Sequence, residues 1–222
     1  MSAFESLQAG ERSFQSTGLG GFEAKHYLSG TTLVLVNLGQ YDLAETKLIE
    51  LEHLTSSPDY MCRIMFNRLN IALAEQNFQY SSEARLKEVT TYCEQANELL
   101  YLQFSQTIWH YFKFIDDGVD LGRVSEWLDN HHKNESQVLA LNYPYLSSAY
   151  YATLAQGHHL LGEVAAAKKY AQTALTFVSL GNVIFKVSAM DVMIAVLEGE
   201  GDFHAAFELL KEKGAISASI MQ

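Results

Sequence analysis

The chain has only two prolines and two cysteines among its 222 residues. Because proline removes a backbone donor and clashes inside a helix, its scarcity favours long helices joined by tight turns. The cysteines, Cys62 and Cys93, form no CxxC pair and no metal-ligand spacing. We therefore expect two reduced thiols, packed as small hydrophobic residues in a cytoplasmic protein.

Basic residues are scarce as well. Fifteen Lys and Arg stand against 26 Asp and Glu, which gives a net charge of −11. Such a charge repels nucleic acid and anionic membranes. No apolar run approaches the roughly 20 residues that span a bilayer, and the N-terminal residues lack the pattern of a signal peptide. The sequence thus predicts a cytoplasmic protein with no nucleic-acid partner and no membrane insertion.

Motifs for catalysis are missing too: the sequence contains no GxSxG, no HExxH and no Walker sequence. Two histidine pairs, His131-His132 and His158-His159, are the best candidates for metal ligands. Adjacent residues on a helix point about 100° apart, however, so neither pair can easily share one ion. We expect no enzyme, no metal and no cofactor.

Acidic and aromatic residues also have structural explanations. Asp116-Asp117, and Asp191 with Glu198, resemble acid–base carboxylates, but solvated helix ends explain them better. Aromatic residues at helical spacing fill the gaps between helices, and we assign this packing role to Trp109, Tyr111, Phe112 and Trp127.

What the sequence does contain is a repeated helical pattern. In residues 144–180, apolar side chains recur at steps of three and four on both sides of Gly162. A glycine there can adopt the left-handed conformation that ends a helix and reverses the chain, so this segment predicts an antiparallel helix hairpin. Ala155 and Ala167 are small enough to let the two helices approach closely. Ala174 would do the same toward the next hairpin.

The pattern recurs along the chain. After Gly39 and Gly201, an aromatic residue follows at the second position and an alanine at the fifth; these are Tyr41 and Ala44, then Phe203 and Ala206. Weaker turns are placed at Gln79 and Gly118. The five turns are separated by 40, 39, 44 and 39 residues. A period near 40 with one helix pair per period is typical of a solenoid.

The sequence therefore predicts an all-α, right-handed superhelical solenoid of about five antiparallel hairpins. The hairpins are placed at 22–57, 58–103, 104–133, 144–180 and 183–213. Residues 1–21 are expected to form a capping helix, from about residue 3 to 15, and a loop. Residues 214–222 are expected to begin a further helix or cap after a turn at Gly214, and we expect the natural chain to continue past Gln222.

These features resemble the tetratricopeptide repeat (TPR). The residues that fall on that family's motif positions are Gly39, Tyr41, Ala44, Ala155, Gly162, Ala167, Ala174, Gly201, Phe203 and Ala206. The usual TPR period is 34 residues, so the chain is similar to the longer-repeat variety common in bacterial regulatory proteins. The first hairpin departs from the motif, because Thr31 and Thr32 replace its usual Leu-Gly/Ala pair.

The resemblance implies a concave groove, lined by the first helix of each hairpin, that binds a peptide or a partner protein. Carried over to this sequence, the groove positions are His26, Ser29, Leu33, Ala152, Gln156, His159, Asp191 and Ala195. None of them is Lys or Arg, which argues against the TPR subgroup that clamps a C-terminal carboxylate.

Three functions remain open. The chain is expected to be an interaction or sensory scaffold module within a larger bacterial signalling protein, such as one with a diguanylate cyclase as its output domain. The alternatives are a free-standing adaptor or co-chaperone, and a homo-oligomeric scaffold such as a homodimer.

Overall fold

The computed structural model describes residues 21–75, 83–115, 119–177 and 183–220. Within these ranges the chain is α-helical apart from short connections, and it contains no β-strand. The described helices are α2 (Gly21–Asn37), α3 (Tyr41–Leu54), α4 (Pro58–Ala74), α5 (Glu83–Gln95), α6 (Leu99–Ile115), α7 (Leu121–His132), α8 (Glu135–Ala140), α9 (Pro144–Leu160), α10 (Val164–Thr176), α11 (Val183–Gly199) and α12 (Phe203–Ile220). The expected all-α class is confirmed for this part of the chain.

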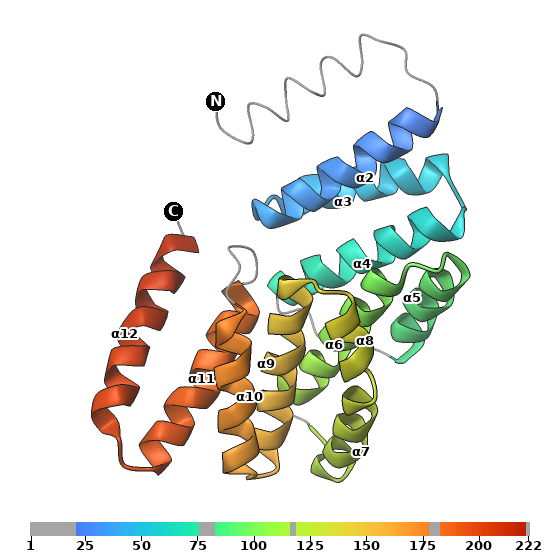
Figure 1. Cartoon of the computed structure of the whole chain (residues 1–222). Helices are drawn as coiled ribbons and strands as arrows, with labels where there is room; N and C mark the ends of the chain where they lie inside the picture. The colour runs from blue at the N-terminus through green and yellow to red at the C-terminus, as the bar shows by residue number, and fades with distance from the viewer. Residues whose placement is uncertain (1–20, 76–82, 116–118, 178–182, 221–222) are drawn as a thin grey trace. The chain divides into compact units, whose positions relative to one another are not determined.

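The chain divides into two compact units, one ending at Leu102 and the other beginning at Gln103. In the first unit α2 packs against α3 and α4 against α5, and α4 also contacts α2 and α3 (Figure 1). The core of this unit lies along α4, where Ile64 and Leu69 are almost completely buried.

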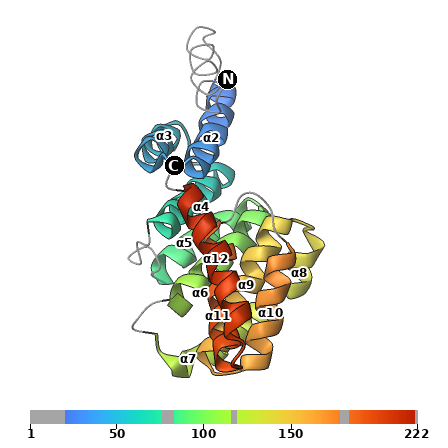
Figure 2. The ribbon, with the colours of Figure 1, turned by 90° about the vertical axis from the view of Figure 1, so that its left-hand side faces the viewer.

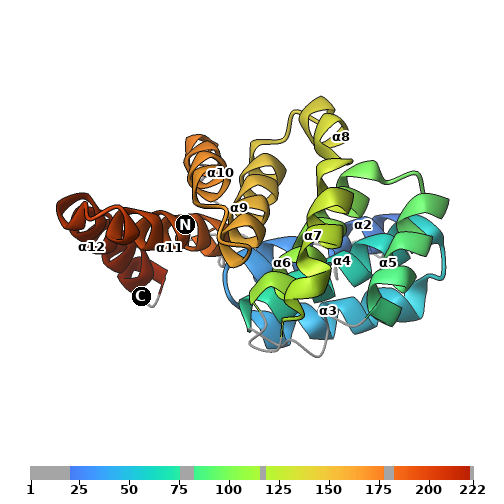
Figure 3. The same ribbon diagram turned by 90° about the horizontal axis from the view of Figure 1, so that it is seen from below.

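In the second unit α9 packs against α10 and α11 against α12, and α11 also lies beside α9 and α10 (Figure 3). Helices α7 and α8, which precede α9 in the sequence, also contact it. Most of these contacts join helices that are neighbours in sequence, which is compatible with a helical-repeat fold. The short helix α8 was not expected from the sequence.

The predicted turn glycines behave as expected. Gly39, Gly162 and Gly201 have φ angles of +70°, +72° and +80°, the left-handed region that glycine adopts without strain. Two turns without glycine use asparagine instead, Asn97 at φ 55° and Asn142 at φ 47°. Asparagine tolerates this conformation because its short polar side chain can hydrogen-bond locally.

Two boundaries differ from the expectation. Helix α6 begins at Leu99, after the turn at Asn97, so the predicted division between residues 103 and 104 falls inside a helix. The expected turn at Gly214 is not seen, because α12 runs through it to Ile220. Glycine inside a helix costs only about 1 kcal/mol relative to alanine, which the rest of the helix can offset. The expected helix at 3–15, the loop glycines before residue 21, Gln79, Asp116-Asp117 and Gly118 lie outside the described residues.

The alanines of the pattern are buried. Ala44, Ala155, Ala167, Ala174 and Ala206 have almost no exposed surface. The aromatic positions are less uniform: Tyr41 is half-buried, whereas Phe203 is 69% exposed.

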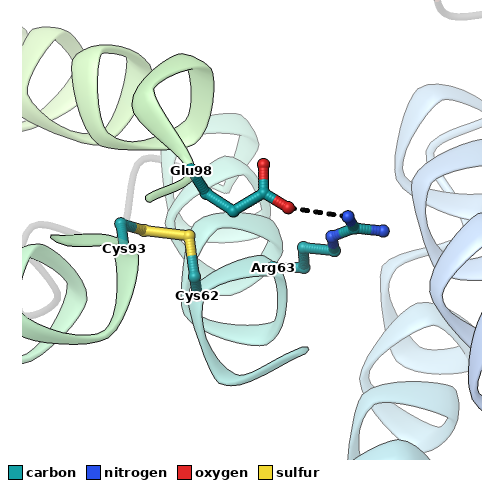
Figure 4. The surroundings of a disulfide bond; sticks show 4 residues. All are labelled: Cys62, Arg63, Cys93 and Glu98. Atoms are coloured by element: carbon teal, nitrogen blue, oxygen red, sulfur yellow. Dashed lines mark hydrogen bonds and ion pairs between the residues drawn. A yellow bond between two sulfur atoms is a disulfide. The ribbon is translucent and has the colours of Figure 1, made fainter. Parts of the chain in front are cut away.

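The expectation of two reduced thiols is wrong. Cys62 on α4 and Cys93 on α5 form a disulfide, with their Cα atoms 4.7 Å apart (Figure 4). Both residues are fully buried, beside an ion pair in which Arg63 Nη2 lies 2.7 Å from Glu98 Oε1. Hairpin packing brings the two cysteines together across 31 residues, which spacing along the sequence could not show. The cysteines therefore give no support to a cytoplasmic location.

None of the helices in the described residues has both the length and the apolar character needed to cross a membrane.

Candidate functional site

The eight predicted groove residues lie on three helices in the two units. His26, Ser29 and Leu33 are on α2 in the first unit; His26 and Leu33 are exposed, whereas Ser29 is buried. The His26 ring packs edge-on to Tyr60 of α4, with a centroid distance of 5.9 Å. On this helix only two of the three positions present a side chain to solvent.

The other five residues lie on α9 and α11 in the second unit, and these two helices are neighbours. Ala152 is completely buried, so its side chain is not available to a partner. Gln156, His159 and Ala195 are half-buried. Asp191 is exposed and forms an ion pair with Lys213 of α12.

A second cluster joins α7, α9 and α10. Nε2 of His132 on α7 lies 3.2 Å from Nε2 of His158 on α9, close enough for a hydrogen bond. Nδ1 of His158 lies 2.5 Å from the carboxylate of Glu163, which precedes α10. The Tyr170 ring of α10 stacks on His158, with an interplanar angle of 16°, and also contacts His132.

The surroundings of the two histidines determine which of their ring nitrogens carry a proton. Burial, reinforced by the neighbouring His158, holds the pKa of His132 below its usual value, so His132 is neutral at pH 7. If Nδ1–H of His158 donates to Glu163, its Nε2 is free to accept the Nε2–H of His132. The cluster is then a chain of two hydrogen bonds that ties three helices together.

The adjacent histidine points elsewhere. His131 is buried and stacks on Tyr150 of α9, with ring centroids 4.3 Å apart, and it also contacts His110 of α6. Burial lowers the pKa of His110 to about 4 and that of His131 well below its usual value. The prediction that neighbouring histidines diverge is confirmed for His131 and His132. The pairing of His132 with His158 was missed, because it depends on how α7 meets α9.

Tyrosines extend the cluster along α9. The Tyr151 hydroxyl donates to Glu135 Oε1 at 3.1 Å, and its ring stacks on Tyr170 and Phe177. Burial and this carboxylate raise the pKa of Tyr151 to about 12, so the hydroxyl stays protonated. In the part of the chain that the structure describes, no group of three or more His, Cys, Asp or Glu side chains is arranged to hold a metal ion.

The first unit contains a cavity of about 260 Å³ between α3 and α4. Its lining residues are Tyr41, Asp42, Glu45, Arg68, Ile71, Ala72 and Glu75. Arg68 is held by Glu45 at 2.9 Å and by Glu52 at 2.9 Å. Three carboxylates and one guanidinium leave the lining acidic, which disfavours anionic ligands such as phosphates.

In its described residues the protein is therefore all-α, with clusters of histidine and tyrosine side chains between its helices. No family model, no curated protein and no solved structure matches the chain.

Proposed function

We propose that the chain is a TPR-like module that binds a peptide or a partner protein across the surface of α9 and α11. The observation that carries this proposal is the packing order of the second unit. Helix α9 lies beside α11, while α10 and α12 pack against them as the second helix of each pair. In helical-repeat proteins, this order places the first helices in one layer that partners can contact.

The chemistry of that layer indicates the kind of partner. Gln156, His159 and Asp191 are polar and at least partly exposed, and Ala195 adds a small apolar position. Such a mixed surface suits an extended or helical protein segment, which brings both backbone polar groups and apolar side chains.

The resemblance to long-repeat TPR arrays favours a non-catalytic part of a bacterial signalling or regulatory protein, in which the module senses or recruits the partner. A free-standing adaptor is the alternative. The reading frame of the gene distinguishes them, because a signalling protein would carry an output domain encoded in the same frame.

Site-specific photo-crosslinking in the cells that express the gene tests the proposal. A photoreactive amino acid replaces Gln156 in one variant and Ala195 in another, and the matched control carries it at Gln172, which is exposed on α10. We expect the same partner to be cross-linked from both groove positions and not from the control.

The captured partner is then purified and titrated against the intact chain and against Gln156→Arg. A loss of affinity of about tenfold or more, without loss of helicity, is the expected result. Equal cross-linking from all three positions, or none from the groove positions, would contradict the proposal.

A further inference from the structure

Two histidines from different helices of the second unit meet at their ring nitrogens. Nε2 of His132, the last residue of α7, lies 3.2 Å from Nε2 of His158 on α9. Helix α10 runs beside α9 (Figure 2), and its Tyr170 ring contacts both imidazoles. Nδ1 of His158 lies 2.5 Å from a carboxylate oxygen of Glu163. The histidine pair therefore joins the end of α7 to the α9–α10 hairpin.

This geometry limits the number of protons that the pair can hold. A carboxylate accepts hydrogen bonds, so Nδ1 of His158 carries a proton that it donates to Glu163. One proton between the two Nε2 atoms completes a second hydrogen bond, whichever imidazole carries it. His158 can thus become cationic without loss of the contact, because Glu163 offsets its charge. When His132 is protonated as well, two N–H groups and two positive charges face each other, and neither Nε2 can accept.

We propose that the His132–His158 contact is a pH switch, which holds the end of α7 against α9 at neutral pH and breaks when both imidazoles are protonated. The site is shielded from water, since only 12% of the His158 side chain is exposed. Solvent and salt therefore screen the repulsion between the two cations less than they would at an open surface.

The charged groups around His132 set the direction of its response. Burial and the neighbouring His158 lower the pKa of His132, and Lys169 of α10 acts in the same direction. Glu135 of α8 and Asp129 of α7 act in the opposite direction without reversing the shift. The closed contact thus binds protons less readily than an open one, in which the imidazole titrates near 6.5. Acid below that pH therefore favours opening.

The adjacent His131 adds to this response. Its ring is almost completely buried against Tyr150 of α9, and among the described residues neither of its ring nitrogens has a hydrogen-bond partner. Burial, reinforced by His110, holds the pKa of His131 well below its usual value. When the end of α7 moves away from α9, water reaches this ring and it binds a proton too. Opening therefore takes up more than one proton, which makes it steeper with pH than the titration of a single histidine.

The switch is connected to the proposed binding surface through α9. Gln156 and His159, two of the groove positions, lie within two residues of His158 on this helix. Opening of the contact would therefore give acid control over partner binding. This consequence rests on the proposed function, whereas the switch itself does not.

Hydrogen exchange of the intact chain, read by mass spectrometry at about pH 7.5 and about pH 5.5, provides the test. Exchange times are adjusted for the intrinsic rates at each pH. Protection of the last turn of α7 is expected to fall with acid relative to that of α12. The fall is limited to about tenfold for each unit by which the pKa of His132 rises on opening. Equal protection of this turn at both pH values overturns the proposal.

His158→Gln separates the switch from general acid destabilisation. Its amide can still hydrogen-bond to His132 but cannot become cationic, so protection of the last turn of α7 should fall less with acid. The matched control is His159→Gln, which replaces the neighbouring half-buried histidine and should respond as wild type does. The ratio of protection at the two pH values is compared, so a variant that is less protected at both still reports. The same ratio in His158→Gln and wild type overturns the proposal.

NMR titration of the imidazole rings follows the proton itself. The pKa of His132 is expected to be below its usual value in wild type and higher in His158→Gln, because the charge of the neighbouring ring is gone. An unchanged pKa of His132 in the variant overturns the switch. Partner binding is then compared at the two pH values with the cross-linked partner. Equal binding, with an acid-sensitive α7, supports the switch and contradicts its control of the groove.

Discussion

Two helix pairs of the second unit fill the space between their helices in different ways. Between α9 and α10 the contact is made by alanine: Ala155, Ala167, Ala171 and Ala174 are all buried. The backbones come close enough for the Ser148 hydroxyl of α9 to donate to the backbone carbonyl of Ala174 on α10, at 3.2 Å.

Between α6 and α7 the backbones stay apart and large rings bridge the gap. Trp109 and Phe114 of α6 both contact Trp127 of α7, with ring centroids 6.0 and 6.2 Å apart. His110 and His131 extend this contact into the core. The packing role expected for the aromatic residues is confirmed, since Trp109, Tyr111, Phe112 and Trp127 are all buried.

The two kinds of contact should respond differently to substitutions that change side-chain volume. An alanine contact tolerates no added volume, whereas an aromatic contact tolerates no lost volume. The aromatic pair also buries two imidazoles whose pKa values are lowered by burial, so the stability of this pair should respond to acid. Four experiments on variants and pH separate these properties.

The largest expected effect is at Trp127. Trp127→Ala removes a ring that fills the space between α6 and α7, and the resulting cavity should lower the free energy of unfolding by about 3–5 kcal/mol. Chemical denaturation followed by the fluorescence of Trp109 measures it. Leu121→Ala, an exposed apolar residue on the same helix, is the control and should change stability by no more than about 0.5 kcal/mol. A small loss at Trp127 would mean that other side chains, not this ring, hold the two helices.

Acid should destabilise the same helix pair. The folded-state pKa of His110 is about 4, while an unfolded histidine titrates near 6.5. The unfolded chain therefore binds more protons between these values, so the free energy of unfolding should fall as the pH drops from 6.5 toward 4. His110 alone accounts for roughly 3 kcal/mol over this window. Burial also lowers the pKa of His131, so this residue should make the free energy of unfolding fall more steeply with acid.

Urea denaturation at a series of pH values measures this dependence. His131→Phe keeps a ring against Tyr150 but removes one titrating group, so its stability should fall less steeply with acid than that of wild type. Parallel curves for the variant and wild type would show that His131 does not contribute.

The alanine contact should respond to added volume instead. Ala167→Leu forces three more carbon atoms between α9 and α10, and we expect a loss of about 1–3 kcal/mol through overpacking. Leucine at Ala165, which is exposed on the same helix, is the matched control. A stability within a few tenths of a kcal/mol of wild type would place Ala167 outside the helix–helix contact.

The sequence predicted the alanine-packed parts of the molecule better than the aromatic parts. Two helices that pack closely need small residues at fixed positions, so the spacing between Gly162 and its alanines is strict. Such a fixed spacing can be recognised in the sequence alone. The aromatic contacts depend on how large side chains from separate segments meet, and so the pairing of His132 with His158 could not be predicted. The Cys62–Cys93 disulfide could not be predicted either, because it depends on which faces of α4 and α5 pack together.

Only some of the turns could be predicted from the sequence. Gly39, Gly162 and Gly201 were predicted because glycine is the usual residue at a left-handed helix end. Asn97 and Asn142 have the same conformation, but asparagine is common on helix surfaces and carries no comparable signal. The predicted groove residues are only partly available, since burial of Ala152 and Ser29 depends on neighbouring helices that a repeat motif alone does not specify.

The smallest expected effect tests the turn that joins α9 and α10. A side chain at Gly162 would meet no atom within 4 Å, so substitution there costs only the left-handed backbone conformation at φ +72°. We expect Gly162→Ala to lower the free energy of unfolding by about 1–2 kcal/mol, and Gly162→Asn by less, because asparagine tolerates this conformation, as Asn142 does at the preceding turn. Chemical denaturation of both variants measures the difference. If alanine and asparagine are equally tolerated, backbone conformation does not limit the turn, and the close approach of α9 and α10 must depend on the alanine contact alone.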